Sequence, residues 1–246
     1  MVRLYKDWAV IIPMANEENE FEEFISLLSL VLTELKSGTV YLVVDDVSKD
    51  RTLQLCRELS ERDIRFHTIY APENKSVVDA YLKGYRIAYE NGHQLIIEMD
   101  AGLSHDPRAL PVFLRALNEG NDCAFGSRFI NGGSMGDSPI NRWLLSRVGT
   151  ILANILLGTN LYDMTSGYQG FHRLVVKKIL DYNLKSKAHF YQTEIRYLLR
   201  KYKFSEVPIH YNAPSPRVSQ KAIRNAIETL LYYFFKRVTR NGVYLN

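Results

Sequence analysis

The sequence predicts an α/β fold built on a mostly parallel sheet with helices on both faces. Short apolar runs without polar alternation recur in the first half of the chain, as is typical of buried parallel strands. Helical patterns separate these runs, so the chain forms successive strand–helix–strand units. We expect strands at residues 9–13, 40–45, 64–70, 94–99 and 122–126.

The helices between these strands are predicted from apolar residues that recur at helical spacing. One helix is expected over 21–35, a second over 52–59 and a third over 78–88. After residue 126 the pattern changes to a turn-rich loop at 131–139, an apolar helix at 140–157 and a second turn-rich stretch at 163–167. A helix at 191–201 and a strand at 204–211 follow.

The predicted organisation is one domain over residues 1–212, then a linker and an amphipathic helix over 213–246. The linker carries Pro214-Ser215-Pro216. A chain of 246 residues is long enough for one large core, and its 46% hydrophobic content is that of an ordinary globular protein. No stretch has the ~18 uncharged apolar residues of a membrane span or the pattern of a signal peptide, so a cytoplasmic location is expected.

Composition also narrows the partners. The net charge of +4 comes largely from Lys and Arg residues after position 184, which suggests an anionic partner near the C-terminal third. Cys56 and Cys123 are expected to be buried thiols, because two cysteines give no disulfide framework. No His or Cys spacing indicates zinc, and no basic patch with aromatic platforms indicates nucleic-acid binding.

Carboxylates follow three of the predicted strands. Glu17 follows the first strand, Asp45 and Asp46 end the second, and Asp100 follows the fourth. Ligands of α/β proteins bind at this end of the strands, so these acids are candidates for contact with a nucleobase and a ribose. The alternative is helix capping, by Asn16 after the first strand and by Ser48 or Asp50 after the second.

Asp100 is the candidate metal ligand. Three strand-end acids that converge on one sheet edge are unsuited to a bare phosphate unless a divalent cation lies between them. The chain has no Gly-rich phosphate loop of either nucleotide-binding pattern. The expected ligand is therefore a diphosphate bridged to Asp100 by Mg²⁺ or Mn²⁺.

The order of these motifs resembles the family 2 glycosyltransferases, and within them the dolichyl-phosphate and polyprenyl-phosphate mannosyltransferases. The matching segments are 12–19, 44–50, 74–75 with 80–86, 99–107, 126–129, 163–168 and 206–209. The resemblance implies a single Rossmann-like domain of the GT-A type. Family members have Asp-Ala-Asp where this chain has Asp100-Ala101-Gly102, and often an aromatic residue in place of Ala15.

The resemblance also implies a set of donor-binding residues. The residues expected around the nucleotide sugar are Pro13, Ala15, Glu17, Val44, Asp45, Asp46, Asp100, Ala101 and Gly102. The implied donor is a nucleoside-diphosphate sugar, with GDP-mannose favoured over a UDP-sugar.

The acceptor side is expected to be cationic. Arg128 follows the fifth strand, and Arg142 and Ser146 are one helical turn apart, so they share a helix face. Matching positions in the family bind the acceptor phosphate, and the planar guanidinium of Arg is suited to that role. Arg217 and Lys221 stand where the family has further phosphate-binding residues.

Glu194 is the candidate general base. A sugar hydroxyl would need such a base, whereas a phosphate acceptor is already ionised at neutral pH. The alternative is that Glu194 pairs with Arg196 or a nearby lysine. Gln192 lies beside it in a Gln-x-Glu pattern of the family.

The last helix has one apolar face, widened by aromatic residues and flanked by Lys and Arg at both ends. This pattern is typical of a helix that lies in a membrane interface, and packing on the domain or on a second subunit of a homodimer is the alternative. We therefore expect an inverting enzyme, peripheral at the cytoplasmic face of a membrane, that transfers a hexose to a polyprenyl phosphate. The alternatives are transfer to a hydroxyl of a surface polysaccharide, and a non-catalytic protein that binds nucleotide sugars.

Overall fold

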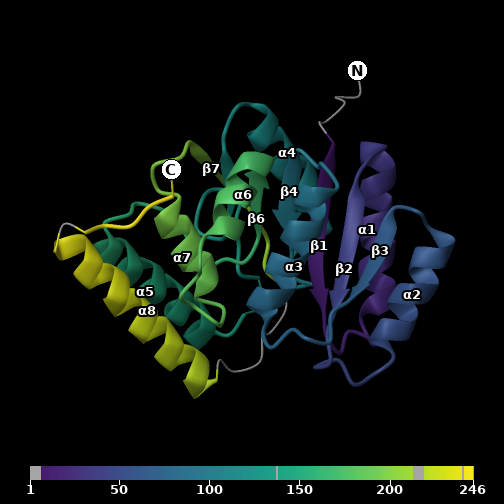
Figure 1. The fold of residues 1–246 in the computed structure, drawn as a ribbon, viewed down its shortest axis with the longest axis horizontal. Coiled ribbons are helices and arrows are strands. Elements are labelled where there is room, and N and C mark those ends of the chain that lie inside the picture. Colours follow the sequence, from purple (N-terminus) through teal and green to yellow (C-terminus); the bar gives the residue numbers. More distant parts are fainter. Residues whose placement is uncertain (1–6, 137, 213–218, 240, 246) are drawn as a thin grey trace.

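The computed structural model describes residues 7–136, 138–212, 219–239 and 241–245. Within these residues, seven strands form one sheet in the order β3-β2-β1-β4-β6-β5-β7 (Figure 1). The strands are β1 (Trp8–Met14), β2 (Thr39–Val44), β3 (Phe66–Tyr70), β4 (Leu95–Glu98), β5 (Cys123–Ser127), β6 (Gln169–His172) and β7 (Phe204–Pro208). The predicted α/β class with a mostly parallel sheet is confirmed.

One strand departs from the prediction. β6 was not expected, and it runs antiparallel between β4 and β5. Its sequence, Gln-Gly-Phe-His, lacks the apolar run by which the other strands are recognised. The strand forms because both of its edges are paired, so tertiary contacts override a weak local preference. β7 is also shorter than expected and ends at Pro208.

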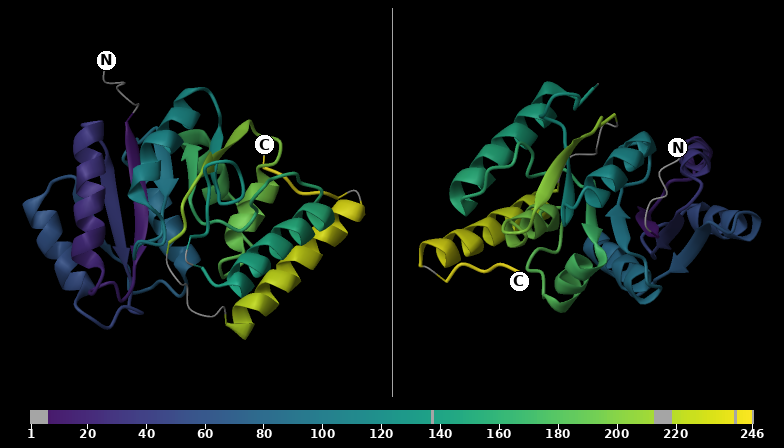
Figure 2. Two further views of the ribbon diagram at one scale, coloured as in Figure 1. Left: turned by 180° about the vertical axis from the view of Figure 1, so that it is seen from behind. Right: turned by 90° about the horizontal axis from the view of Figure 1, so that it is seen from above.

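Helices cover both faces of the sheet (Figure 2). The helices are α1 (Phe21–Leu35), α2 (Thr52–Arg62), α3 (Val77–Glu90), α4 (Leu110–Asn118), α5 (Ile140–Leu157), α6 (Arg173–Asp181), α7 (Tyr191–Leu198) and α8 (Gln220–Val238), with the short 3₁₀ helix η1 (Pro107–Ala109) before α4. All the predicted helices are present. α6 was not predicted.

The strands divide the interior into two cores by alternation of their side chains. Val10 and Ile12 of β1 face one core, which α1, α2 and α4 cover. Ala9 and Ile11 face the other, which α3, α6 and α7 cover. Cys56 and Cys123 are buried free thiols, one in each core, as expected.

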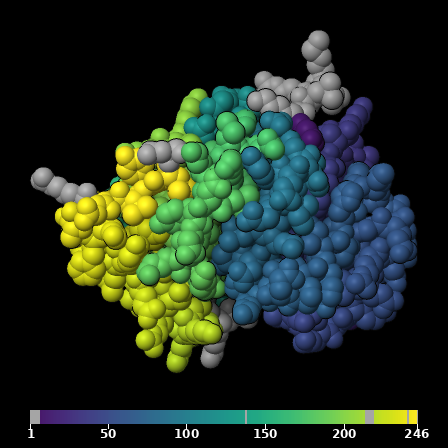
Figure 3. All heavy atoms as spheres, viewed as in Figure 1, coloured from purple at the N-terminus to yellow at the C-terminus, as the bar shows by residue number. Residues whose placement is uncertain are grey.

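α5 and α8 lie side by side at the end of the molecule remote from β3 and α2 (Figures 1 and 2). In the space-filling view, α8 forms the yellow edge of the surface (Figure 3). Tyr233 of α8 is fully buried in the core that α7 covers. The division of the chain at residue 212 stays a prediction, and the proposed linker lies outside the described residues.

None of the helices in the described part of the chain is both long and apolar enough to span a bilayer.

Candidate functional site

The acids that follow β1, β2 and β4 meet at one edge of the sheet, as predicted. β1 pairs in parallel with both β2 and β4, so the carboxyl ends of all three strands point the same way. We call the residues at these ends the carboxylate edge. It contains Pro13, Ala15, Glu17, Val44, Asp45, Asp46, Asp100, Ala101 and Gly102. The side chain of Val44 is buried in the core, so only its backbone faces this edge.

The turns after β1 and β2 are tied together by side-chain hydrogen bonds. The Asn16 backbone N–H donates to Ser48 Oγ at 3.1 Å, and the Glu18 N–H donates to Asp50 Oδ2 at 3.0 Å. Asp50 Oδ1 also accepts from the N–H of Thr52, the first residue of α2. Ser48 and Asp50 therefore position the turns, but neither is the N-cap of α2, which is Arg51 and has no side-chain capping hydrogen bond.

The pKa of Asp50 reflects this role. Desolvation acts to raise it, but the hydrogen bonds from Thr52, Glu18 and Ser48 lower it to about 2. The capping role considered for Asn16 is wrong. Its backbone adopts φ 59°, and its side chain bonds to the turn after β2 and leaves the start of α1 uncapped. Asn tolerates this left-handed conformation better than most residues do.

The two adjacent acids after β2 differ in their surroundings. Asp45 is buried and accepts a hydrogen bond from the Val47 N–H at 3.1 Å. Asp46 is exposed, and its Oδ1 accepts from the Tyr70 hydroxyl at 2.5 Å. Asp46 therefore has its second oxygen available to a ligand at the carboxylate edge.

Asp100 is held by two neighbours and keeps one oxygen accessible. The Tyr81 hydroxyl donates to Asp100 Oδ1 at 2.6 Å. The Asp100 backbone N–H donates to Nδ1 of His105, and burial lowers the pKa of that imidazole. The side chain of Asp100 is 40% exposed. Asp100 Oδ2 is therefore the oxygen available to a cation.

Glu17 lies beside Asp100, against Gly102. A Cβ atom at residue 102 would lie 2.6 Å from Glu17 Oε2, so the Glu17 carboxylate uses the space that a side chain there would need. Burial, with the charges of Glu20, Asp100 and Asp50, raises the pKa of Glu17 to about 7. The absence of a side chain at Gly102 thus brings a second carboxylate towards Asp100.

A second glycine places Gln192 near the same aspartate. A Cβ at Gly167 would collide with Gln192 Nε2 and would lie 3.3 Å from Asp100 Oδ2. Gln192 is almost fully buried in α7. The sequence contained a signal for it, the Gln-x-Glu pattern, but the prediction assigned chemistry to Glu194 and missed Gln192.

The base role predicted for Glu194 is not compatible with its position. Its carboxylate is fully buried and accepts from the backbone N–H groups of Lys185 and Ser186, both at 2.7 Å. The Tyr233 hydroxyl of α8 donates to it as well, at 2.5 Å. Glu194 therefore fixes the loop before α7 and joins α7 to α8. The alternative pairing with Arg196 is also wrong, since Arg196 donates to backbone carbonyls and to Gln169.

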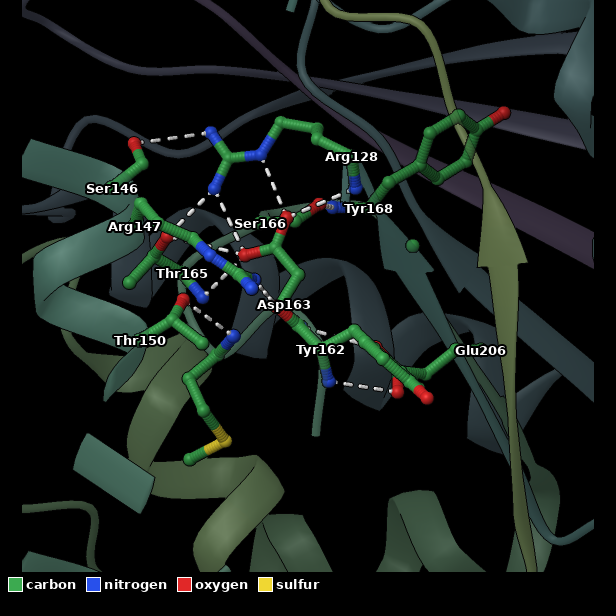
Figure 4. A network of polar contacts seen from close by, with 12 residues as sticks. Arg128, Ser146, Arg147, Thr150, Tyr162, Asp163, Thr165, Ser166, Tyr168 and Glu206 are labelled. Carbon is green, nitrogen blue, oxygen red and sulfur yellow. Dashed lines mark hydrogen bonds and ion pairs between the residues drawn. The ribbon is translucent and has the colours of Figure 1, made fainter. Parts of the chain in front are cut away.

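Arg128 forms a buried ion pair with Asp163. Its Nε and Nη2 donate to the two carboxylate oxygens at 2.7 and 2.9 Å, and Nη2 also reaches Thr165 Oγ1 at 2.6 Å (Figure 4). Although burial opposes it, Arg128 lowers the pKa of Asp163 to about 2. The remaining nitrogen, Nη1, faces Ser146 Oγ at 3.4 Å. Most of the Arg128 guanidinium is thus used within the protein.

The loop that carries Asp163 is fixed from two sides. Glu206 of β7 accepts from the backbone N–H groups of Tyr162 and Asp163, and Thr150 of α5 accepts from the Met164 N–H (Figure 4). These contacts position Arg128 and the middle of α5 relative to the sheet. Local sequence patterns do not predict these contacts, because Arg128 and Asp163 are 35 residues apart, although both lie in segments that match the family.

Arg142 and Ser146 line a cavity of about 270 Å³ between α5 and α8, which we call the α5–α8 groove. Along α5 the lining changes from Arg142 and Ser146 to Leu152, and α8 adds apolar side chains that include Ile223 and Ile227. Arg142 Nε is buried and has no hydrogen-bond partner among the described residues. The groove thus joins a cationic end to an apolar channel.

Tyr211 lies between the carboxylate edge and this groove. The centroid of its ring lies 6.2 Å from the centroid of the His105 ring. The Arg128 guanidinium lies 5.7 Å from the Tyr211 ring centroid. Burial raises its pKa, and the charges of both Arg142 and Asp100 act on it. The carboxylate edge and the cationic end of the groove are therefore adjacent.

The last two predicted phosphate contacts remain untested. Lys221 is exposed in the first turn of α8, and Arg217 lies outside the described residues.

Comparison with known proteins identifies related sequences. The model of glycosyl transferase family 2 matches residues 9–180. Polyprenol monophosphomannose synthase of Mycolicibacterium smegmatis is 32% identical over 90% of this chain and 83% of its own length. Undecaprenyl-phosphate mannosyltransferase of Micrococcus luteus is 32% identical over 82% of both chains. Dolichol-phosphate mannosyltransferase of Pyrococcus furiosus is 32% identical over 70% of this chain and 47% of the relative.

Solved structures show the same fold. Glucosyl-3-phosphoglycerate synthase from Mycobacterium tuberculosis, in complex with Mn²⁺, UDP and phosphoglyceric acid, superposes with a TM-score of 0.67 and 15% identity. The alignment covers 92% of this chain and 78% of that one. The same enzyme with Mg²⁺ and UDP gives a TM-score of 0.66 and 16% identity. The predicted GT-A architecture is confirmed.

Proposed function

The chain belongs to glycosyl transferase family 2, and we propose that it transfers a hexose from a nucleoside-diphosphate sugar to a polyprenyl phosphate. We propose mannose from GDP-mannose, because three relatives with 32% identity are named as polyprenyl-type mannosyl enzymes. The observation that carries the proposal is the α5–α8 groove, which joins an arginine to an apolar channel beside the carboxylate edge.

The groove matches a phosphate with a long apolar tail. Arg142 and Ser146 are placed to bind the phosphate, with Nη1 of Arg128 adjacent to Ser146. The buried and unpaired Nε of Arg142 favours an anion there, since a buried donor without a partner costs free energy. The apolar residues further along α5 and α8 would contact the polyprenyl chain.

The buried position of Glu194 favours a phosphate acceptor over a sugar hydroxyl. A hydroxyl must lose its proton as it attacks, whereas a phosphate is ionised at neutral pH and needs only alignment and charge neutralisation. Both carboxylate oxygens of Glu194 already accept hydrogen bonds within the protein, so neither is available to an acceptor in the groove. A single displacement by the acceptor phosphate on the anomeric carbon would invert its configuration.

The carboxylate edge fits a divalent cation. Asp100 Oδ2 is accessible, and the donor set consists of carboxylates, which suit Mg²⁺ or Mn²⁺. When bound, such a cation neutralises the charge that develops on the diphosphate leaving group. Among the described residues no cluster of three or more acidic, His or Cys side chains forms a complete site, so diphosphate oxygens and water would complete the coordination.

Asp46 and Glu17 are proposed to contact the donor from the other two strand ends. Asp46 keeps one oxygen accessible at the open side of the edge, beside Tyr70. The exposed Ala15 leaves space there for the nucleoside.

We propose that α5 and α8 together dock on the cytoplasmic face of a membrane. α5 exposes the apolar stripe Ile140, Leu144, Val148, Ile151 and Ile155, and α8 exposes Ile227, Leu231, Phe235 and Val238. An apolar helix face flanked by cations is typical of interfacial helices. This surface would bring the groove to its lipid substrate, and the alternative of a homodimer through α8 stays a prediction.

A transfer assay tests the proposal. Purified protein is incubated with undecaprenyl phosphate in vesicles and radiolabelled GDP-mannose or UDP-glucose, with Mn²⁺ or with EDTA. We expect Mn²⁺-dependent label in the lipid fraction with GDP-mannose. Transfer from UDP-glucose alone would exclude the mannose assignment. Nucleotide binding that ignores Mn²⁺, without transfer or donor hydrolysis, would indicate a non-catalytic protein.

A further inference from the structure

We propose that Glu17 is a second carboxylate ligand of the cation bound at Asp100, acting from the space that Gly102 leaves open. This role rests on the proposed function, because it requires a divalent cation at the donor diphosphate. It changes what Glu17 does there: Glu17 would contact the donor through the cation and not through the nucleoside.

Asp100 by itself offers little to a cation. Its Oδ1 is engaged by the Tyr81 hydroxyl at 2.6 Å, so Oδ2 is the available ligand atom. His105 does not add a ligand from its nearer nitrogen, because Nδ1 accepts the Asp100 backbone N–H. Mg²⁺ and Mn²⁺ need several oxygen ligands, and a lone carboxylate oxygen binds them weakly.

Gly102 is two residues beyond Asp100. The Glu17 carboxylate occupies the space where a side chain of residue 102 would lie. A side chain at this position would begin 2.6 Å from Glu17 Oε2 and 3.6 Å from Oε1. Gly102 also has φ +66°, a left-handed conformation that most side chains disfavour. The glycine therefore lets the Glu17 carboxylate approach the turn that carries Asp100.

The Glu17 carboxylate is unpaired within the part of the chain that the structure describes. Among the residues that the structure describes, none donates a hydrogen bond to it, whereas its neighbour Glu18 is paired with Arg51. Leaving a partly buried carboxylate unpaired beside Asp100 is unfavourable. A cation between the two acids removes this cost.

The backbone of Glu17 is held in place before any ligand binds. Its N–H donates to Oγ1 of the fully buried Thr52 at 2.8 Å. The residues on either side are tied to Ser48 and Asp50. Because the turn is fixed from three points, the Glu17 carboxylate would need only a side-chain adjustment to bind a cation.

The test measures Mn²⁺ and nucleotide binding separately, and so has readouts besides activity. Mn²⁺ affinity is measured by electron paramagnetic resonance with saturating GDP, and with UDP in parallel, and nucleotide affinity is measured calorimetrically in EDTA. The variants are Glu17→Gln and Asp100→Asn. The control is Glu20→Gln, which removes a nearby charge at an exposed position where α1 begins.

We expect Glu17→Gln and Asp100→Asn to weaken Mn²⁺ binding at least tenfold, and Glu20→Gln to change it less than twofold. Nucleotide affinity in EDTA should change less than twofold in Glu17→Gln. Mn²⁺ affinity that is lost in Asp100→Asn but kept in Glu17→Gln would overturn the role of Glu17 and leave the proposed function intact. A fall in nucleotide affinity in EDTA with Mn²⁺ affinity unchanged would likewise overturn it.

A position swap sharpens the test. Gly102→Asp in the wild-type background should not strengthen Mn²⁺ binding, because the new side chain meets Glu17. The same substitution combined with Glu17→Ala, which empties that space, should recover at least part of the affinity lost in Glu17→Ala alone, and a double variant that binds no better than Glu17→Ala would contradict the shared space. If the wild type binds no Mn²⁺ with either nucleotide, both this role and the metal site of the proposed function are wrong.

Discussion

The carboxylate edge and the α5–α8 groove hold their charged side chains in opposite ways. At the edge, Asp46 and Asp100 each use one oxygen in a hydrogen bond to a tyrosine and keep the other accessible. At the groove, Arg128 is almost fully buried and bonded to Asp163. The carboxylate edge presents negative charge to a cation. At the groove, the positive charge of Arg128 is neutralised by an ion pair within the protein.

This difference separates binding from positioning. Charges that remain partly exposed can neutralise a ligand, but a buried pair costs desolvation and mainly fixes geometry. Arg142, whose Nε is unpaired, is the cation of the groove that most resembles the acids of the edge. Substitutions at the edge should therefore change activity, and those in the buried pair should change stability.

The largest effect is expected for Asp100→Ala. The loss of the accessible carboxylate should lower the transfer rate at least ~1000-fold, equivalent to about 4 kcal/mol in the transition state. The measurement is the initial rate of lipid glycosylation with saturating donor, with the melting temperature as a control for folding. A rate within tenfold of the wild type would show that Asp100 is not the metal ligand.

Asp163→Asn should instead destabilise the fold. The substitution leaves the buried guanidinium of Arg128 without its counter-ion, which costs about 3 kcal/mol or more in the free energy of unfolding. Urea denaturation measures this change. The matched control is Asp181→Asn, whose solvent-exposed pair with Lys177 should contribute little to stability. Equal effects of the two substitutions would contradict the structural role of the buried pair.

Arg142→Ala should separate the groove from the edge. We expect kcat/KM for the polyprenyl phosphate to fall about 100-fold, or about 3 kcal/mol, because a charge-assisted contact to phosphate is lost. Nucleotide binding should not change. Arg147→Ala on the same helix is the control, since Arg147 bonds to the Tyr162 carbonyl and lies over Phe129. A similar loss in the control would argue against a specific phosphate contact.

The apolar surface of α5 and α8 should govern membrane binding. Ile155→Ser and Phe235→Ser should each reduce partition into anionic vesicles about tenfold, because each removes ~1.5 kcal/mol of apolar burial. Flotation with labelled vesicles measures this. Ile64→Ser is the control, since Ile64 is 87% exposed in the N-terminal half, between α2 and β3. If the control loses as much binding, the interaction is not confined to these helices.

The smallest effect concerns Glu98, a fully buried acid two residues before Asp100. Burial raises its pKa to about 8, so the folded protein favours the protonated form. The stability contributed by this form is complete below pH 4.5 and is lost as pH rises through 8. The wild type should therefore lose stability between pH 5 and pH 9, whereas Glu98→Gln, which cannot ionise, should not. The unfolding free energy of Glu98→Gln relative to that of the wild type should rise by at least ~1 kcal/mol over this range. Parallel pH profiles of the two unfolding free energies would contradict this.

Local patterns were sufficient to predict most of the fold. The apolar runs of β1 and β4 and the helical spacing in α1 and α3 are signals contained within short segments. β6 was missed because four residues with one aromatic carry no such signal. It exists because β4 and β5 provide partners on both sides.

The candidate site was predictable where residues follow strands. Glu17, Asp46 and Asp100 meet because the ends of parallel strands meet, which the alternation of elements already implies. Glu194 and Gln192 show the limit of this reasoning. They are two residues apart on α7, yet Glu194 is bonded to the loop before the helix and Gln192 lies near Asp100. Which of them faces the site depends on how α7 packs.

The sequence by itself determined the fold class, the family and the place of the acids along the sheet edge, because these follow from periodicity and from motifs in order. The tertiary structure alone decided which charges are free. It paired Arg128 with Asp163, buried Glu194 under Tyr233 and brought Glu17 into the space beside Gly102. These contacts join segments far apart in the chain, and burial and hydrogen bonding set in the folded state determine what each charge can do.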